Sequence, residues 1–116
     1  MCLKSGKSYI MIKVKNIKQI QEDHKKYKRL LDNEKDFIKQ LKYKRILREC
    51  EYSLLQIEWQ LNNISIKEDN TYRQLFIDRY IKSMPIEILI DKYKVSKSNL
   101  YKILNRTKEL FENRWI

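Results

Sequence analysis

Apolar residues recur at alternating steps of three and four along residues 17–64. The first run with these steps consists of Ile17, Ile20, His24, Tyr27, Leu31, Glu34, Ile38 and Leu41, in which the histidine and the glutamate are flaws. The second run consists of Leu47, Cys50, Leu54, Ile57, Leu61 and Ile64, and it is out of phase with the first. This heptad spacing predicts a helical coiled-coil segment over residues 17–64.

The spacing leaves open how this segment is arranged. Continuing the first run beyond Leu41 would place Arg45 and Arg48 in the apolar seam, and no glycine or proline separates the two runs. Either one long helix has an apolar face that rotates near Lys42–Ile46, or two helices meet there. One helix cannot bury such a seam alone, so we expect self-association, a hairpin or a partner.

Two stretches without this spacing flank the coiled-coil segment. Residues 1–16 have no helical stripe, and residues 1–20 hold five lysines and no acidic residue. We therefore predict a flexible basic N-terminal tail over residues 1–16. A short strand is the alternative, because Ile10, Ile12 and Val14 alternate with Met11 and Lys13. On the other side, NNISIKEDNTYRQ interrupts the repeat with two capping-box spacings, which predicts a helix end near Asn63 and a new helix near Thr71.

A small helical domain is predicted over residues 68–116. Its first helix ends at the sequence KSMP, and Pro85 suits the first turn of a second helix at residues 86–93. The residues KVS form the next turn. Ser96 is then a favourable N-cap for a third helix over residues 97–113.

The third helix has one apolar and one polar side. Its apolar side groups Leu100, Ile103, Leu104, Thr107, Leu110 and Phe111. Residues 97–108 contain four basic residues and no acidic one. A short helix, a turn of three or four residues and a longer helix with a basic face form the helix-turn-helix pattern of DNA-binding proteins. The alternative is a plain helical hairpin with a solvated lysine face.

Side-chain chemistry assigns roles on that polar side. Lysine donates to guanine acceptors, asparagine can bond adenine in two places, and phosphate contacts orient the protein without reading sequence. The predicted base-reading residues are Lys97, Ser98, Tyr101, Lys102 and Asn105. The predicted phosphate-binding residues are Lys92, Lys94, Ser96, Asn99, Arg106 and Lys108. For Tyr101, a packed or interface position is the alternative.

The composition favours a polyanionic partner, either nucleic acid or an anionic membrane, and the helix-turn-helix pattern makes double-stranded DNA the predicted partner. The formal net charge is +11, from 26 basic and 15 acidic side chains among 116 residues. The apolar runs are too short to span a bilayer, so we predict no membrane partner. Two separated cysteines and a single histidine predict no metal site, no cofactor and a reducing cytoplasm. The acidic residues form no pair suited to acid–base work, so we predict no catalytic residue and no enzyme.

The stretch RYIKSMPIEILIDKYKVSKSNLYKILNRTKELFE, Arg79 to Glu112, resembles region 4 of bacterial sigma factors. The likeness covers the RY before the turn, the glutamate that opens the second helix, and VSKSNLYKIL at the start of the third. Preceded by a helical extension, the chain is similar to the small ArpU/RinA-like phage regulators of late-gene transcription. The resemblance implies a phage or prophage origin, base contacts at Lys97, Ser98 and Tyr101, and RNA polymerase as a further candidate partner.

Two positions depart from that family pattern. Lys94 stands where the family turn commonly has glycine, and Ile90 stands where a small alanine is usual. The lysine implies a strained or altered turn, and the isoleucine implies a slightly wider helix spacing.

We expect a DNA-binding regulator that forms a homo-oligomer through residues 17–64, with a dimer favoured. A dimer places two recognition helices on a repeated or palindromic site. One alternative is the small subunit of a phage terminase, which also joins a helix-turn-helix to an oligomerising helical segment. Another is a coiled-coil adaptor protein without DNA binding, whose basic face is only solvated.

Overall fold

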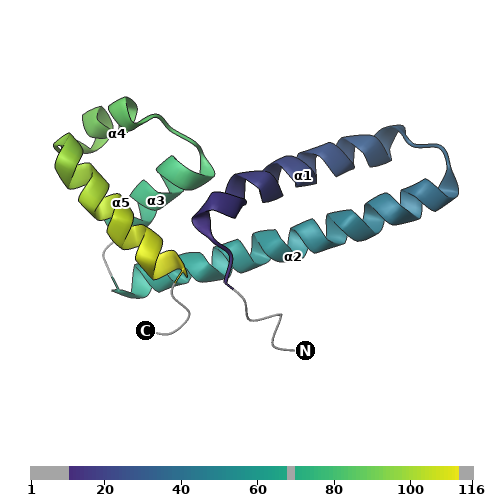
Figure 1. The fold of residues 1–116 in the computed structure, drawn as a ribbon, viewed down its shortest axis with the longest axis horizontal. Helices are drawn as coiled ribbons and strands as arrows, with labels where there is room; N and C mark the ends of the chain where they lie inside the picture. Colours follow the sequence, from purple (N-terminus) through teal and green to yellow (C-terminus); the bar gives the residue numbers. More distant parts are fainter. Residues whose placement is uncertain (1–10, 68–69, 113–116) are drawn as a thin grey trace.

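The computed structural model of this chain describes residues 11–67 and 70–112, and its regular elements within these ranges are all helices (Figure 1). The prediction of an all-α fold is therefore confirmed. In chain order, the elements are α1 (Val14–Asn33), α2 (Phe37–Lys67), α3 (Asn70–Phe76), the π-helix η2 (Ile77–Ile81), α4 (Ile86–Tyr93) and α5 (Lys97–Glu112). The shape is elongated, because the radius of gyration of 17.0 Å exceeds the value of about 13 Å for a compact domain of this length.

Residues 17–64 lie in a hairpin of two antiparallel helices, α1 and α2, which run side by side in Figure 1. Tyr27 of α1 packs against Tyr43 of α2, with 5.8 Å between the ring centroids. The chain reverses at residues 34–36, so a junction near Lys42–Ile46 is wrong. The hairpin covers one face of α2 without a second molecule.

The turn of this hairpin needs neither glycine nor proline, because side chains satisfy its backbone groups. Glu34 has an extended backbone, with φ −90° and ψ 132°. The Gln40 amide donates a hydrogen bond to the Glu34 carbonyl at 2.7 Å, and the Asp36 backbone N–H donates to the Glu34 carboxylate at 3.2 Å. Such local side-chain bonds are an alternative to continuing the helix.

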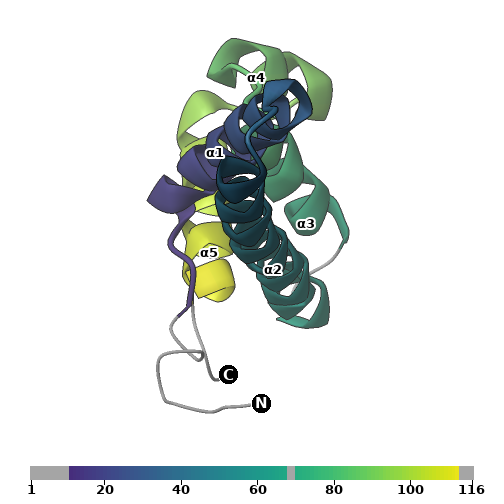
Figure 2. The ribbon, with the colours of Figure 1, turned by 90° about the vertical axis from the view of Figure 1, so that its right-hand side faces the viewer.

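The base of the hairpin shares a hydrophobic core with the C-terminal helices. Its buried members are Ile17, Ile57, Leu61, Ile64, Phe76, Leu110 and Phe111. The rings of Phe76 and Phe111 stack with 4.7 Å between their centroids. α3 and α5 contact each other and both pack against α2, as the view along the hairpin in Figure 2 shows. The predicted segments 17–64 and 68–116 therefore pack against each other across this core.

The chain just before α1 is also packed, which corrects the predicted tail. Met11 is buried, and Gln60 of α2 pairs with the backbone of Ile12, accepting from its N–H at 2.9 Å and donating to its carbonyl at 3.1 Å. Because α1 already begins at Val14, a flexible tail through residue 16 is wrong for residues 11–16. The first ten residues of the predicted tail lie outside the described ranges.

Replacing Gln60 by leucine is expected to lower the free energy of unfolding by about 1–3 kcal/mol. Gln60 is fully buried and also donates to the Phe111 carbonyl at 2.9 Å, so leucine leaves three backbone groups without their partner. Urea unfolding followed by circular dichroism measures the loss. Gln19→Leu is the control, because Gln19 is exposed. Equal stability of the two variants would contradict the role of Gln60.

A second cluster holds the remaining helices together. Its buried members are Leu75, Ile86, Leu89, Leu100 and Leu104. The bend between η2 and α4 is held by the Arg79 guanidinium, which donates to the Met84 carbonyl at 2.8 Å, and by the Met84 N–H, which donates to the Asp78 carbonyl at 2.9 Å. These bonds and this cluster set the position of α4 beside α5.

Candidate nucleic-acid interface

A three-residue turn joins α4 to α5. Lys94 caps α4 in the left-handed conformation, with φ 56° and ψ 46°, and its N–H donates to the Ile90 carbonyl at 2.9 Å. Val95 is half-buried against the second cluster. The Ser96 hydroxyl accepts the Asn99 N–H at 3.2 Å, which confirms Ser96 as the N-cap of α5. The turn therefore starts α5 at Lys97, as the sequence predicted.

Glycine at position 94 is expected to raise the free energy of unfolding by about 0.5–1 kcal/mol, because glycine adopts the left-handed conformation without steric cost. Lys102→Gly is the matched control, since Lys102 lies inside α5 and glycine there is expected to cost about 1 kcal/mol. Thermal or urea unfolding of the two variants gives both values. A loss of stability in Lys94→Gly would contradict the strain at this lysine.

The two sides of α5 are separated as predicted. Leu100, Leu104, Thr107, Leu110 and Phe111 are buried against the rest of the chain, and Ile103 is half-buried. The buried Thr107 hydroxyl has a hydrogen-bond partner, because it donates to the Leu104 carbonyl at 2.8 Å. The opposite side of α5 is exposed from Lys97 to Glu109.

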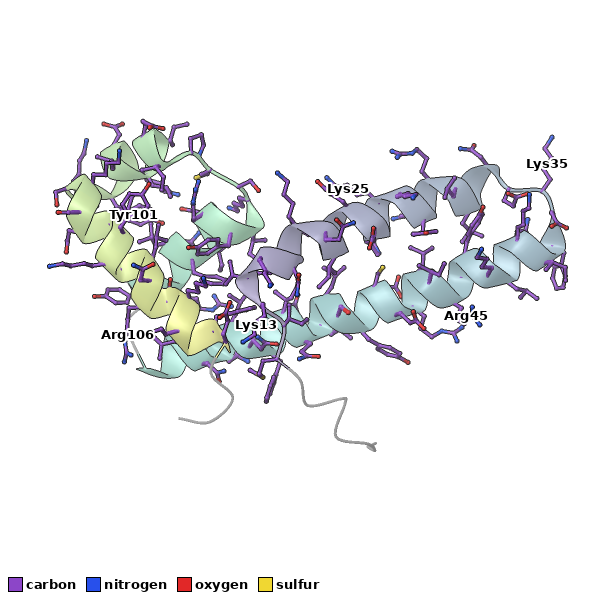
Figure 3. All side chains as sticks on the ribbon, in the orientation of Figure 1. Lys13, Lys25, Lys35, Arg45, Tyr101 and Arg106 are labelled. Atoms are coloured by element: carbon purple, nitrogen blue, oxygen red, sulfur yellow. The ribbon has the colours of Figure 1, made fainter. Side chains whose placement is uncertain are left out.

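All eleven residues predicted to contact DNA have exposed side chains. They are Lys92, Lys94, Ser96, Lys97, Ser98, Asn99, Tyr101, Lys102, Asn105, Arg106 and Lys108. Ser98, Lys102 and Asn105 follow one another at steps of four and three, so they share one line along α5. Tyr101 and Arg106 are labelled on α5 in Figure 3. Tyr101 is 43% exposed, which rules out a core position within the chain.

Lys92 already has a partner inside the fold. Asp78 of η2 is fully buried, and its carboxylate accepts hydrogen bonds from the Lys92 ammonium at 2.7 Å and the Tyr93 hydroxyl at 2.6 Å. The Gln74 amide donates to the other carboxylate oxygen at 3.1 Å. This network ties the end of α4 to η2. It gives Lys92 a structural role, and its predicted phosphate contact stays a prediction.

The ionisation of Asp78 follows from these contacts. Burial raises the pKa of this carboxyl, but the hydrogen bonds from Lys92, Tyr93 and Gln74 outweigh burial and lower the pKa below its ordinary value of 3.8. Burial and the Asp78 carboxylate both raise the pKa of Tyr93, which keeps its hydroxyl protonated. At neutral pH the Asp78 carboxylate is therefore charged and accepts hydrogen bonds from three donors. These bonds fix the end of α4 against η2.

The structure adds two lysines that sequence reasoning did not assign to the interface. Lys13 and Lys15 line a surface hollow together with Lys108 and Glu112. The Glu112 carboxylate accepts the Val14 N–H at 2.8 Å, which holds the start of α1 against the end of α5. The lysine-rich N-terminal composition was visible in the sequence, but its position beside α5 was not. Basic charge thus continues from α5 onto the start of α1.

Among residues 11–67 and 70–112, no three or more His, Cys, Asp or Glu side chains are grouped so that they could hold a metal ion. No helix in this part of the chain has the length and apolar character needed to cross a membrane. Cys50 is a free thiol, and burial together with the carboxylates of Asp23, Glu49 and Glu51 raises its pKa.

Comparison with known proteins does not identify a relative. No protein-family model, no curated protein sequence and no solved structure matches the chain.

Proposed function

We propose that this protein is a sequence-specific double-stranded DNA-binding regulator of transcription, encoded by a phage or prophage and active in the host cytoplasm. The observation that carries this proposal is the polar side of α5. It is exposed, carries four basic residues and no acidic one between Lys97 and Lys108, and is presented by a capped three-residue turn after α4. Under this proposal, α4 and α5 form a helix-turn-helix of the kind seen in sigma region 4.

The stretch of α5 from Lys97 to Asn105 enters the major groove in this proposal. Lys102 donates to guanine, Asn105 bonds an adenine edge and Ser98 serves either base, while Lys97 and Tyr101 complete the base-reading set. Each good bidentate contact discriminates against a wrong base by about 1–3 kcal/mol.

Phosphate contacts surround that line of base-reading residues. Ser96 and Asn99 lie at the start of α5, where the positive end of the helix dipole favours an anion. The basic side chains proposed to contact phosphate are Lys94, Arg106 and Lys108, together with Lys13 and Lys15. These contacts set the orientation of α5 in the groove, and they make binding dependent on salt.

The Asp78 network supports a recognition unit with fixed geometry. Base reading requires side chains held at the right positions by well-packed supporting groups. Asp78 holds the end of α4 through Lys92 and Tyr93, and α4 precedes the turn that starts α5. We propose that Lys92 mainly positions this unit, and that a homodimer of the chain acts at late-gene promoters with RNA polymerase as a further partner.

A selection from random DNA duplexes at two salt concentrations tests the proposed function. We expect enrichment of a shared motif, and an affinity that falls steeply as salt rises because several phosphates are contacted. Binding without an enriched motif would contradict the proposed base-reading role and leave only the phosphate contacts supported. Failure to bind any duplex at low salt would overturn the proposal and favour the adaptor alternative.

A further inference from the structure

The hairpin leaves one complete heptad stripe of α2 uncovered. Its members follow at steps of three and four and are all exposed: Ile38, Leu41, Arg45, Arg48, Tyr52, Leu55, Trp59 and Asn62. Leu55 is 61% and Trp59 58% exposed, which is high for side chains of this size. The stripe continues the spacing of the first apolar run beyond the hairpin turn. It therefore has the pattern of a coiled-coil seam without the helix that would cover it.

The α1 helix and the C-terminal helices pack on another side of α2. The contacts to that side come from the second apolar run, including Leu54, Ile57 and Leu61. In Figure 3, Arg45 points away from α1. The stripe is consequently accessible along α2 without any change in the fold of a single chain.

Charge is divided sharply along α2. Between Phe37 and Arg48 there are five basic residues and no acidic one, and between Glu49 and Asn63 there are three acidic residues and no basic one. The division falls at the middle of the stripe. Two copies of α2 are complementary in charge when they run in opposite directions, because the basic half of each copy then faces the acidic half of the other.

We propose that the stripe is the interface with a second copy of this chain, which docks α2 against α2 in antiparallel orientation about a twofold axis beside residue 50. This inference deepens the dimer that forms part of the proposed function. The stripe alternates between heptad positions a and d. In this register each a position of one α2 faces a d position of the other, as in knobs-into-holes packing. The paired layers are Ile38 with Asn62, Leu41 with Trp59, Arg45 with Leu55 and Arg48 with Tyr52, each across the axis.

The two arginines in the stripe select this orientation. A parallel pair in register would place Arg45 against Arg45 and Arg48 against Arg48, which brings like charges together in a desolvated seam. The antiparallel pair places Arg48 over the Tyr52 ring of the second copy, where a guanidinium is favourable. The stem of Arg45 packs along Leu55 of the second copy while its charged end reaches solvent.

This geometry sets the distance between the two cores that hold α5. Leu61, where α2 contacts the core shared with α5, lies eleven residues from residue 50. At a rise of 1.5 Å per residue, the two Leu61 positions are about 33 Å apart along α2. The proposed dimer therefore places the two copies of α5 at opposite ends of the paired α2 helices.

Charge reversal at the flanks of the stripe tests the proposed register. Lys44 and Glu58 are exposed, and they face each other across the axis only in the antiparallel pair. Lys44→Glu or Glu58→Lys alone is expected to weaken dimerisation about tenfold, because two attractive pairs become repulsive. The double variant, and an equimolar mixture of the two single variants, are expected to restore the dimer. Sedimentation equilibrium without DNA measures all four samples.

A substitution within the stripe gives a second test of the proposed interface. Leu55→Lys is expected to give a folded monomer, because Leu55 is exposed within one chain and the lysine would face Arg45 of the second copy, whereas the control Ile88→Lys on α4 leaves the dimer intact. A monomeric or larger-than-dimeric wild type, or a double variant as weak as the single ones, would overturn the inference. Since no DNA is present, these outcomes leave the duplex selection as a separate test of DNA binding.

Discussion

Alanine at Asn105 or Lys102 is expected to weaken binding to the selected DNA motif by about 1–3 kcal/mol, roughly 5- to 150-fold. Both side chains are exposed on the polar side of α5, on the line proposed to meet base edges. Affinity for unrelated duplexes is expected to change much less, since most of that affinity comes from phosphate contacts. The preference for the motif over unrelated DNA therefore falls with each substitution.

Fluorescence anisotropy with labelled duplexes measures these losses, and two further variants calibrate them. Lys35→Ala removes an exposed lysine at the far end of the hairpin (Figure 3), so it controls for the loss of charge alone. Lys108→Ala is expected to weaken binding to all duplexes alike and to reduce the salt slope by about one. If Lys102→Ala and Asn105→Ala lowered specific and non-specific affinity equally, the base-reading role would be excluded.

Removing the buried carboxylate of Asp78 is expected to produce a large loss of stability, about 2–3 kcal/mol for Asp78→Ala. The substitution leaves the Tyr93 hydroxyl and the Gln74 amide without their acceptor and the Lys92 ammonium without its counter-ion. Urea unfolding at neutral pH gives the value. Asp91→Ala is the matched control, because Asp91 is an exposed residue whose ion pair with Lys94 spans 3.7 Å at the surface.

The contribution of Asp78 also has a defined pH dependence. Because its pKa is lower in the folded chain than the ordinary 3.8, ionised Asp78 stabilises the fold fully above the ordinary value. That stabilisation is lost as the pH falls below 3.8 and through the lower pKa of the folded state. Wild type and Asp78→Asn should therefore converge in stability in acid. A gap that stays constant down to the lowest pH would contradict an ionised Asp78.

The C-terminal elements were predictable because local chemistry marks their ends. Pro85 precedes α4, and Ser96 caps α5, so the predicted bounds of both helices agree with the structure within one residue. The turn of the hairpin carries no such mark. It depends on the side chains of Glu34 and Gln40, which cap the backbone only when the chain has already reversed.

Tertiary contacts explain what sequence reasoning missed at the candidate interface. The exposed side of α5 followed from helical periodicity alone. The pairing of Lys92 with Asp78 did not, because the two residues are fourteen positions apart on different helices. The position of Lys13 and Lys15 beside Lys108 likewise depends on the packing of α1 against α5. Periodicity identifies which side of a helix is polar, but not which polar groups are already engaged.

The most direct measurement is an amide chemical-shift map of the isotope-labelled protein, titrated with a mixed-sequence duplex at low salt. We expect the largest changes in the turn after α4 and along the exposed side of α5, from Lys94 to Lys108. Smaller changes are expected at Lys13 and Lys15, and the outer stripe of α2 should remain unperturbed. Changes confined to the hairpin, with α5 unaffected at saturating DNA, would contradict a recognition role for this helix.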